Sequence, residues 1–439
     1  MALQKRVLLF ASKLGYQTRS FQAAAERLGV ELAYVTDRCS RLDDPWNDRA
    51  LPVHFELPEG AASAVLEAQH GLRVDGIVAV GDRPTVTAAF VARGLGLSYN
   101  HPASVEACRS KLRMREVMRD AELPVPWFRA VPLHTPPQPL PLGIEYPCVL
   151  KPISLSASQG ITRANNHREF LAGAARLKQI LNSPEILATR EMNRDRMIVE
   201  GYIEGSEVAV EALLTEGALR LLAVFDKPDP LVGPYFEETI YLTPSRFSLE
   251  EQRMIESSLL HCVRAMGLTH GPLHAEFRLN DQGVWPIEIA ARPIGGLCAR
   301  ALRFELPGSR ELIALEELLL RHALGLPGSD AQREESASGV MMIPVPHSGI
   351  LQSVQGQEAA RTTPFITSLE ITARLHDYLA AWPEGSSYLG FLFARASDPD
   401  KVESALREAH TKLHFTLTPR LPVEHPLTHS VPPGDSRAN

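Results

Sequence analysis

The first hundred residues alternate between short apolar runs and amphipathic runs with helical spacing. Residues 6–12 (RVLLFAS), 30–37 (VELAYVTD) and 74–82 (VDGIVAVGD) predict buried strands, and residues 20–29 (SFQAAAERLG) predict a helix that ends at Gly29. Strands that alternate with helices are typical of a parallel sheet, so we expect a Rossmann-like layer at the start of the chain.

The loop after the first strand, SKLGYQT at residues 12–18, contains one glycine, so it lacks the GxGxxG fingerprint of dinucleotide-binding proteins. We therefore expect a scaffold layer that contributes loops to a site elsewhere. An oxidoreductase built on this layer is disfavoured for the same reason.

The middle of the chain predicts a larger set of strands and helices. A helix is expected from about Ser104 to Ala121, followed by a Pro-rich linker at residues 131–143. Further strands are expected at residues 146–153, 161–164, 196–203, 206–215 and 218–226. Further helical runs are expected at residues 167–181, 249–267, 297–308 and 311–325. A charged linker at 326–339 then precedes an α/β segment at 340–418.

Composition narrows the class of protein. The chain has 439 residues, of which 44% are hydrophobic and 22% are charged. Its net charge is −7, and it has no basic tract. This charge disfavours nucleic acid and acidic membranes as partners. Its five cysteines are scattered without metal-site spacing, which favours a reducing cytoplasm. The first apolar run is too short for the core of a signal peptide, so none is expected, and no run reaches the ~18 apolar residues of a membrane span.

The segment from Leu273 to Arg292 predicts a hairpin with an unusual pair of charges. Folded about Gln282, the hairpin makes Glu276 and Glu288 direct cross-strand partners, and like charges placed opposite each other destabilise a sheet. A shared proton, a neighbouring arginine or a bound cation would relieve the repulsion. Arg278 lies on the same face, so a salt-bridged hairpin and a metal site both remain open. Two carboxylates without histidine or thiolate suit Mg²⁺, which predicts a nucleotide-triphosphate site.

Groups that could hold phosphate precede this hairpin. Lys151 lies within an apolar strand, where an unpaired ammonium would be costly, and the loop SLSASQG at residues 154–160 combines small side chains with hydroxyls. Lys111 and Arg115 lie four residues apart on one helical face. Each feature has an ordinary alternative: a plain turn for the loop and a solvated basic face for the helix.

The segment VEGYIEGSE, residues 199–207, follows an apolar strand. A strand end can offer backbone groups to an adenine edge, and a glutamate can accept both hydroxyls of a ribose, so Glu200 and Glu207 are candidates for these contacts. Two exposed loop glutamates are the alternative.

Taken together, the ordered set resembles the ATP-grasp superfamily of carboxylate–amine ligases over about residues 100–300. The resemblance implies an α/β chain with an ATP-grasp fold, an N-terminal Rossmann-like (preATP-grasp) domain and a small C-terminal α+β domain. The expected divisions are a Rossmann-like domain at 1–110, a lid subdomain at 111–198, a large subdomain with the nucleotide and metal site at 199–330, the C-terminal domain at 338–420 and a disordered tail at 421–439.

The resemblance also implies roles for individual residues. ATP would be held through its phosphates and adenosine by Lys111, Lys151, Ser156, Ser158, Gly160, Glu200, Tyr202, Ile203 and Glu207. Glu276 and Glu288 match the paired ligands of Mg²⁺ or Mn²⁺. Arg292 matches the arginine that steadies the reacting carboxylate or acyl phosphate, and with Glu288 and Lys151 it would form the catalytic group.

One position departs from the family pattern. The family often has an asparagine two residues after the second metal-binding glutamate, where this chain has Ala290. The motifs SLSASQG and EIAARPIGG are most similar to the bacterial L-amino acid ligases that form dipeptides. The implied reaction joins a carboxylate, expected to come from an amino acid, to an amine through an acyl phosphate, with release of ADP and phosphate.

The substrate-binding residues are less defined by motif. Glu237 is expected to read an amino group, and a surface loop with solvated charges is the alternative. His274 shares the strand face of Glu276, where a structural histidine is favoured over a catalytic one. Gly295 and Gly296 could offer free N–H groups or form a tight turn. The expected partners are small-molecule substrates, and related ligases are often dimers, so a homodimer is a candidate assembly. Two rival functions remain: another ATP-grasp chemistry, by a carboxyphosphate-forming carboxylase or a purine-pathway ligase, and a non-catalytic ATP-binding module.

Overall fold

A computed structural model describes residues 4–12, 16–37, 50–133, 143–191, 193–328 and 330–419. The tail expected at 421–439, Cys39 and most of the Pro-rich linker therefore lie outside the described residues. The four other cysteines are buried free thiols: Cys108, Cys148, Cys262 and Cys298. Within the described part of the chain, no helix combines the length and apolar character that crossing a bilayer requires.

The N-terminal layer is the parallel α/β unit that the sequence predicts. Its four strands are parallel in the order β3-β2-β1-β4, and helices cover both faces. The strands are β1 (Arg6–Ala11), β2 (Glu31–Thr36), β3 (Leu51–Pro52) and β4 (Gly76–Val80). The helices that follow in this part of the chain are α1 (Tyr16–Leu28), α2 (Pro58–Ala68), α3 (Asp82–Leu95) and α4 (Pro102–Arg109). Alternating β1 residues pack into two different cores, so both faces of the layer are buried.

The helix expected from Ser104 to Ala121 is instead two helices. It breaks at Ser110 into α4 and α5 (Lys111–Asp120), and the hydroxyl of Ser110 accepts a hydrogen bond from the N–H of Arg113 at 3.2 Å. The N–H of Lys111 donates to the carbonyl of Ile153 at 3.0 Å. The prediction was wrong because a serine with an extended backbone is a good N-cap and because this distant carbonyl replaces the lost helical bond. The break turns Lys111 toward the loop after Ile153.

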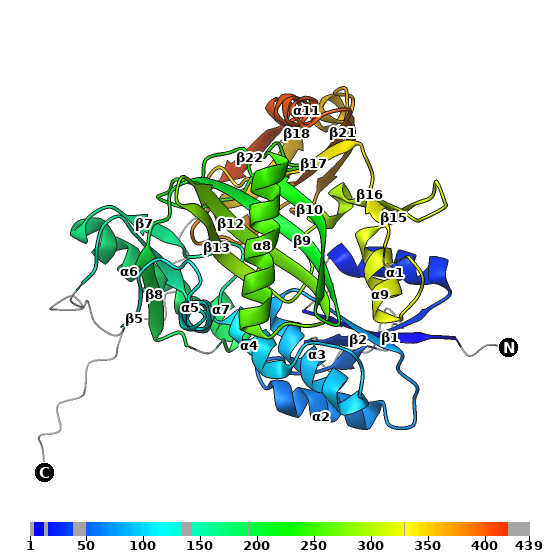
Figure 1. The fold of residues 1–439 in the computed structure, drawn as a ribbon. Coiled ribbons are helices and arrows are strands. Elements are labelled where there is room, and N and C mark those ends of the chain that lie inside the picture. The colour runs from blue at the N-terminus through cyan, green and yellow to red at the C-terminus, as the bar shows by residue number, and fades with distance from the viewer. Residues whose placement is uncertain are drawn as a thin grey trace, which may run out of the picture.

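The lid is a four-stranded antiparallel sheet covered by helices, in the order β5-β8-β6-β7. Its elements are β5 (Phe128–Pro132), β6 (Cys148–Pro152), β7 (Thr162–Ala164), α6 (His167–Leu181), α7 (Pro184–Thr189) and β8 (Arg196–Gly201). Asn166 caps α6, because its side chain accepts a hydrogen bond from the N–H of Glu169. Figure 1 shows this unit to one side of the central sheet.

An eight-stranded sheet forms the centre of the molecule, in the order β13-β12-β9-β10-β11-β17-β21-β19. Its strands are β9 (Ser206–Thr215), β10 (Ala218–Asp226), β11 (Ile240–Thr243), β12 (Gly271–Asn280), β13 (Gly283–Ala290), β17 (Ala337–Ile343), β19 (Ile366–Ile371) and β21 (Gly390–Ala396). Helix α8 (Leu249–Met266) lies along one face (Figure 1) and begins with a capping box of Ser248 and Glu251. The sheet thus runs from the hairpin of paired glutamates into the C-terminal segment.

Short elements complete the C-terminal half. They are the 3₁₀ helix η1 (Cys298–Ala301), β14 (Arg303–Glu305), β15 (Leu312–Ala314), α9 (Leu315–Ala323), β16 (Gln332–Arg333), β18 (Gly349–Gln355), α10 (Gln357–Arg361), β20 (Tyr378–Leu379), α11 (Pro399–Thr411) and β22 (His414–Thr418). The helical runs expected at 297–308 and 311–325 were therefore partly wrong, because strands take up part of each. The apolar residues of these runs can be buried in a strand as well as in a helix, so the apolar pattern did not distinguish the two structures, and burial in the folded protein decided between them.

Candidate active site

The paired glutamates of the hairpin are cross-strand partners, as the sequence predicts. Glu276 of β12 lies opposite Glu288 of β13. The route to this pairing differs from the prediction, because Asn280 pairs with Gly283 across a two-residue tip and a β-bulge between Glu276 and Phe277 then shifts the register. The bulge leaves Ile287 as the extra residue on β13. A bulge next to a site re-aims side chains, and here it restores the pairing of the two carboxylates.

Arg278 does not neutralise this pair. Its Nε donates to Glu207 at 2.8 Å, and its other nitrogens donate to the carbonyls of Ile203 and Leu231, each at 2.6 Å. The cations beside the pair are instead Lys227, 2.9 Å from Glu276, and Lys111, 3.8 Å from Glu288. The alternative of a hairpin bridged by Arg278 is therefore wrong. Each carboxylate has its own lysine, and both lysines come from other parts of the chain.

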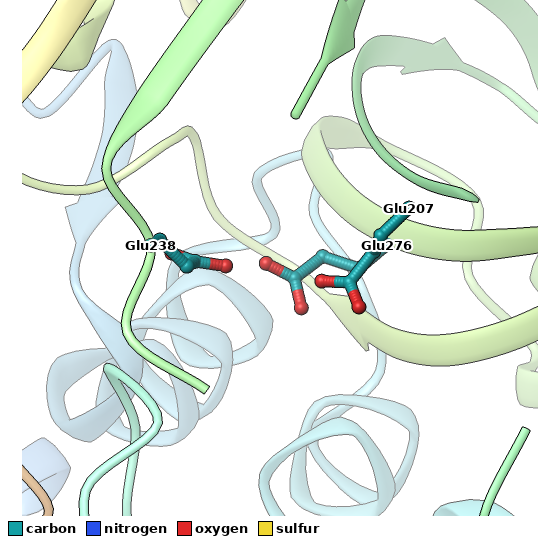
Figure 2. Close-up of side chains that lie close together, drawn as sticks. All are labelled: Glu207, Glu238 and Glu276. Atoms are coloured by element: carbon teal, nitrogen blue, oxygen red, sulfur yellow. The ribbon is translucent and has the colours of Figure 1, made fainter. Parts of the chain in front are cut away.

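Three carboxylates, rather than the predicted two, gather beside the hairpin. Carboxylate oxygens of Glu207, Glu238 and Glu276 lie within 4.8 Å of one another, and Figure 2 shows Glu238 approaching the other two from the opposite side. The Nζ of Lys227 contacts all three and lies 2.8 Å from Glu207. Burial alone would lower the pKa of Lys227, but the three glutamates outweigh it and hold this pKa well above its usual range. The ammonium therefore offsets part of the repulsion among the three carboxylates.

The structure brings Glu238 to the cavity and not its neighbour Glu237, for which the sequence predicted a substrate contact. Glu238 lines the cavity, whereas Glu237 turns away and accepts a backbone hydrogen bond from Val345. Burial, together with the charges of Glu276 and Glu207, raises the pKa of Glu238 to about 7 despite Lys227. The predicted loop thus reaches the cavity through Glu238 and not through Glu237, because the direction of side chains in an irregular loop has no fixed period.

The metal ligands predicted by resemblance fit the cation only in part. Carboxylate oxygens are the donors that Mg²⁺ prefers, and Glu276 stands between Glu288 on its own hairpin and the glutamates across from it. Glu288 is outside the cluster of three. Ala290 is buried and offers no side-chain ligand, so Glu207 and Glu238 are the added oxygen donors near Glu276.

Lys151 and Glu200 form the core of a buried charge network. Glu200 accepts from Arg115 at 2.9 Å and also pairs with Lys151, and the three side chains are 3%, 1% and 9% exposed, respectively. Burial alone would raise the pKa of Glu200, but the two cations outweigh it and lower this pKa to about 2. Burial is the largest cause that lowers the pKa of Lys151. The solvated basic face considered for Lys111 and Arg115 is thus wrong for Arg115.

The predicted adenine hinge is only partly available. The N–H of Tyr202 already donates to the carbonyl of Pro147 at 3.1 Å, and the carbonyl of Ile203 accepts from Arg278. Gly201, Tyr202 and Ile203 nevertheless line the cavity. Glu207, the predicted ribose ligand, also lines the cavity, but both of its carboxylate oxygens already accept from cations.

The loop at residues 154–160 has an unusual backbone, and we call it the small-residue loop. Ala157 and Ser158 adopt positive φ angles of 56° and 53°, which cost energy for residues other than glycine. Ser156 and Ser158 line the cavity, and the Nζ of Lys111 donates to the carbonyl of Leu155 at 2.6 Å. Gly160 was predicted to bind phosphate, but its N–H donates to the carbonyl of Pro383.

Arg292 is held by a residue that the sequence analysis missed. Asp82, the first residue of α3, accepts from Nε of Arg292 at 2.9 Å and from Nη2 at 3.3 Å. Burial would raise the pKa of Asp82, but the charge and hydrogen bonds of Arg292, together with the charges of Lys111 and Arg109, outweigh burial and lower this pKa. Asp82 follows a buried parallel strand, and such strand ends commonly carry site residues, so its position was a usable signal.

His274 lies between two carboxylates. Its Nδ1 is 2.5 Å from Glu211 and its Nε2 is 3.6 Å from Glu276. Glu211 is almost fully buried and also accepts from the N–H of Ile294 at 3.0 Å. Burial would lower the pKa of His274, but Glu211 and Glu276 outweigh it and raise this pKa to about 9. His274 therefore carries a positive charge at neutral pH and orients Glu276.

This pKa predicts how stability depends on pH. Because the folded pKa of about 9 exceeds the ordinary value of 6.5, the stabilisation is fully present below about pH 6.5 and is lost as the pH rises through about 9. It amounts at most to roughly 3 kcal/mol. We expect His274→Gln to flatten the fall in thermal midpoint between pH 6.5 and pH 10, measured by differential scanning fluorimetry. An unchanged slope would contradict the charged state of His274.

Gly295 and Gly296 line the cavity as a tight turn. The N–H of Cys298 donates to the carbonyl of Gly295 at 3.3 Å, and Gly296 has a φ of 60°. The turn requires a left-handed residue, so this alternative is confirmed. The helix that follows, η1, is a single 3₁₀ turn.

All these segments surround one cavity of about 680 Å³. The N-terminal layer contributes Asp82, the lid contributes Lys151 and the small-residue loop, and the central sheet contributes both paired glutamates. The C-terminal segment adds an apolar wall with Tyr388 and Phe391. The cavity thus combines cations, carboxylates and an apolar wall from parts of the chain far apart in sequence.

Comparison with known proteins matches two regions of the chain to families. Residues 144–301 match the ATP-grasp domain, and residues 341–418 match the L-amino acid ligase C-terminal domain 2. Among curated proteins, carnosine synthase 1 of Gallus gallus is 28% identical over 313 residues, which are 68% of this chain and 33% of that protein. The chain therefore spans about a third of that relative.

Solved structures show the same fold over nearly the whole chain. The L-amino acid ligase from Bacillus licheniformis has a TM-score of 0.79 at 24% identity and covers 94% of this chain and 99% of its own. The phosphoribosylglycinamide synthetase from Anaerococcus prevotii has a TM-score of 0.64 at 16% identity and covers 94% of this chain and 100% of its own.

Proposed function

Because the chain is an ATP-grasp carboxylate–amine ligase whose residues 341–418 match the L-amino acid ligase C-terminal domain 2, we propose that it joins the carboxylate of an amino acid to an amine and consumes ATP as it does so. One observation supports this proposal most: two lysines, two paired glutamates and an arginine, the residues to which the resemblance gives the phosphate, metal and carboxylate roles, all line one cavity. These are Lys111, Lys151, Glu276, Glu288 and Arg292.

The proposed reaction has two steps. A substrate carboxylate oxygen attacks the γ-phosphorus of ATP, the bond to the bridging oxygen breaks, and ADP leaves. The amine nitrogen then attacks the acyl carbon of the acyl phosphate, the carbon–oxygen bond to phosphate breaks, and the nitrogen loses a proton. In such transfers, positioning of the reactants and neutralisation of charge supply most of the rate enhancement by the enzyme.

The residues of the chain have distinct tasks in this proposal. Arg292, fixed by its two hydrogen bonds to Asp82, orients the carboxylate for attack. Lys111 and Lys151 offset the charge of the triphosphate. A divalent cation held by Glu276 and Glu288 would supply further neutralisation of phosphate oxygens. The small-residue loop shields the acyl phosphate from water.

Glu238 is the residue to which we assign the binding of the substrate amino group. It lines the cavity where Glu237 does not, and it lies beside Tyr241 and the apolar wall. A substrate ammonium could bind this carboxylate once Lys227 moves toward phosphate. Glu238 is therefore the proposed reader of an amino group, in place of Glu237.

The proposed function is tested by release of ADP and phosphate with Mg²⁺ over a panel of amino acids, singly and in pairs, which includes the constituents of carnosine. We expect release that requires amino acids and a product of the summed mass less one water, identified by mass spectrometry. Bicarbonate-dependent release would support a carboxyphosphate-forming enzyme instead. ATP binding without turnover for any carboxylate and amine would support a non-catalytic module.

A further inference from the structure

A segment of the C-terminal domain forms hydrogen bonds to the small-residue loop. We call residues 381–388 the clamp segment. The indole Nε1 of Trp382 donates to the carbonyl of Ala157 at 3.2 Å, and the carbonyl of Pro383 accepts from the N–H of Gly160 at 2.9 Å. The side-chain amide of Gln159 donates to the carbonyl of Glu384 at 2.8 Å. Three hydrogen bonds therefore join segments more than two hundred residues apart in sequence.

These contacts surround the strained part of the loop. Ala157 and Ser158 have positive φ angles, and such conformations persist only where the surroundings impose them. Two backbone turn bonds also hold this part of the loop: the N–H of Gln159 donates to the carbonyl of Ser156 at 3.3 Å, and the N–H of Ile161, the residue after the loop, donates to the carbonyl of Ser158 at 3.1 Å. The clamp segment bonds to the residues on either side of Ser158, so it is well placed to impose this shape.

The clamp segment also forms part of the cavity wall. Ser386, Ser387 and Tyr388 line the cavity, and the ring of Tyr388 lies 4.9 Å from that of Trp382. Trp382 is buried and does not line the cavity itself. A group that presses on Tyr388 from within the cavity therefore acts on the tryptophan that bonds to the loop.

We propose that Trp382 is a positioning residue that holds the small-residue loop in its nucleotide-binding shape, and that Tyr388 links this hold to the contents of the cavity. The proposal rests on the proposed function only in that the loop contacts ATP. Because coupling between two sites is reciprocal, a ligand packed against Tyr388 changes nucleotide affinity by the same factor by which the nucleotide changes the affinity of that ligand.

One neighbouring contact provides a matched control. Arg176 of α6 lies 3.2 Å from Glu384, but these side chains are 41% and 49% exposed, and exposed ion pairs contribute little. We expect Glu384→Gln to leave the loop unchanged. Trp285→Phe is a second control, because it removes an indole hydrogen bond, to Asn280, that lies outside the cavity wall.

The test uses the full chain with AMP-PNP and Mg²⁺. Trp382→Phe keeps a ring and removes the indole N–H, and we expect faster hydrogen exchange at residues 157–160 and nucleotide affinity weakened roughly three- to tenfold, with the thermal midpoint little changed. Exchange and affinity equal to those of the wild type and of Trp285→Phe would overturn the positioning role.

A double-mutant cycle tests the link to Tyr388. The cycle compares Tyr388→Ala, Trp382→Phe and the double variant. If Tyr388 acts through Trp382, the double variant loses less free energy of AMP-PNP binding than the two single variants lose in sum. Additive losses would overturn the link. None of these measurements needs an amino acid, so a wild-type protein that shows no amino-acid-dependent ADP release would refute the proposed function and leave this test intact.

Discussion

Glu288→Gln is expected to lower turnover about a thousandfold, because a neutral amide is a poor ligand for a hard cation and the phosphate charge would lose its neutralisation. The apoprotein should keep its thermal midpoint or gain slightly. Glu288 is 22% exposed, its nearest cation is 3.8 Å away, and the substitution removes a charge opposite Glu276. The measurement is ADP release at saturating ATP, beside a thermal unfolding curve.

A matched variant separates chemistry from folding in this experiment. Glu305→Gln makes the same change at an exposed position of β14, away from the cavity wall, and should alter neither quantity. Retained turnover in Glu288→Gln would remove Glu288 from the metal site and leave the cluster of Glu207, Glu238 and Glu276 as the cation site. A large fall in the thermal midpoint would show that the pair with Lys111 stabilises the fold.

Glu200→Gln is expected to destabilise the protein by about 3–5 kcal/mol, because it leaves Arg115 and Lys151 as buried cations without a carboxylate between them. The three side chains are at most 9% exposed, so water cannot replace the lost partner. Thermal and urea unfolding measure the effect. Glu204→Gln, at an exposed position nearby, is the control and should change stability little.

The pH dependence of this variant provides a second check. In the wild type the folded pKa of Glu200, about 2, lies below the ordinary value of 4.5, so its stabilisation is present above about pH 4.5 and is lost only as the pH falls through about 2. In Glu200→Gln the lowered pKa of Lys151 should fall further, and the stability deficit should shrink as the pH rises. A deficit that is constant from pH 6 to pH 10 would contradict a charge origin.

Local sequence patterns gave good predictions for strands and helices that bury one apolar face, because the spacing of the apolar residues then differs between the two structures. The strands at 206–215 and 218–226 and the helix at 167–181 have the predicted bounds. The cross-strand pair of Glu276 and Glu288 was also predictable, since a hairpin has few registers and both glutamates must share a face. The apolar runs at 297–308 and 311–325 were not, because strand and helix can both bury such residues.

The partners of the charged side chains could not be predicted from the sequence. Arg278 was expected to face Glu276 and instead bonds to Glu207, on the neighbouring strand β9. Lys227 and Glu238 come from a Pro- and Gly-rich loop whose path no periodicity defines. Asp82 reaches Arg292 across more than two hundred residues, and only the packing of the N-terminal layer against the central sheet brings the two together.

The amino-acid sequence by itself determined the kinds of chemical group at the site, their order along the chain and the local elements that carry them. It did so because apolar periodicity, turn residues and spaced motifs are local properties. The tertiary structure alone decided which carboxylate faces the cavity, which cation neutralises it and which segment holds the small-residue loop. Those outcomes depend on contacts between distant segments, and the energy of each contact depends on burial that no local pattern contains.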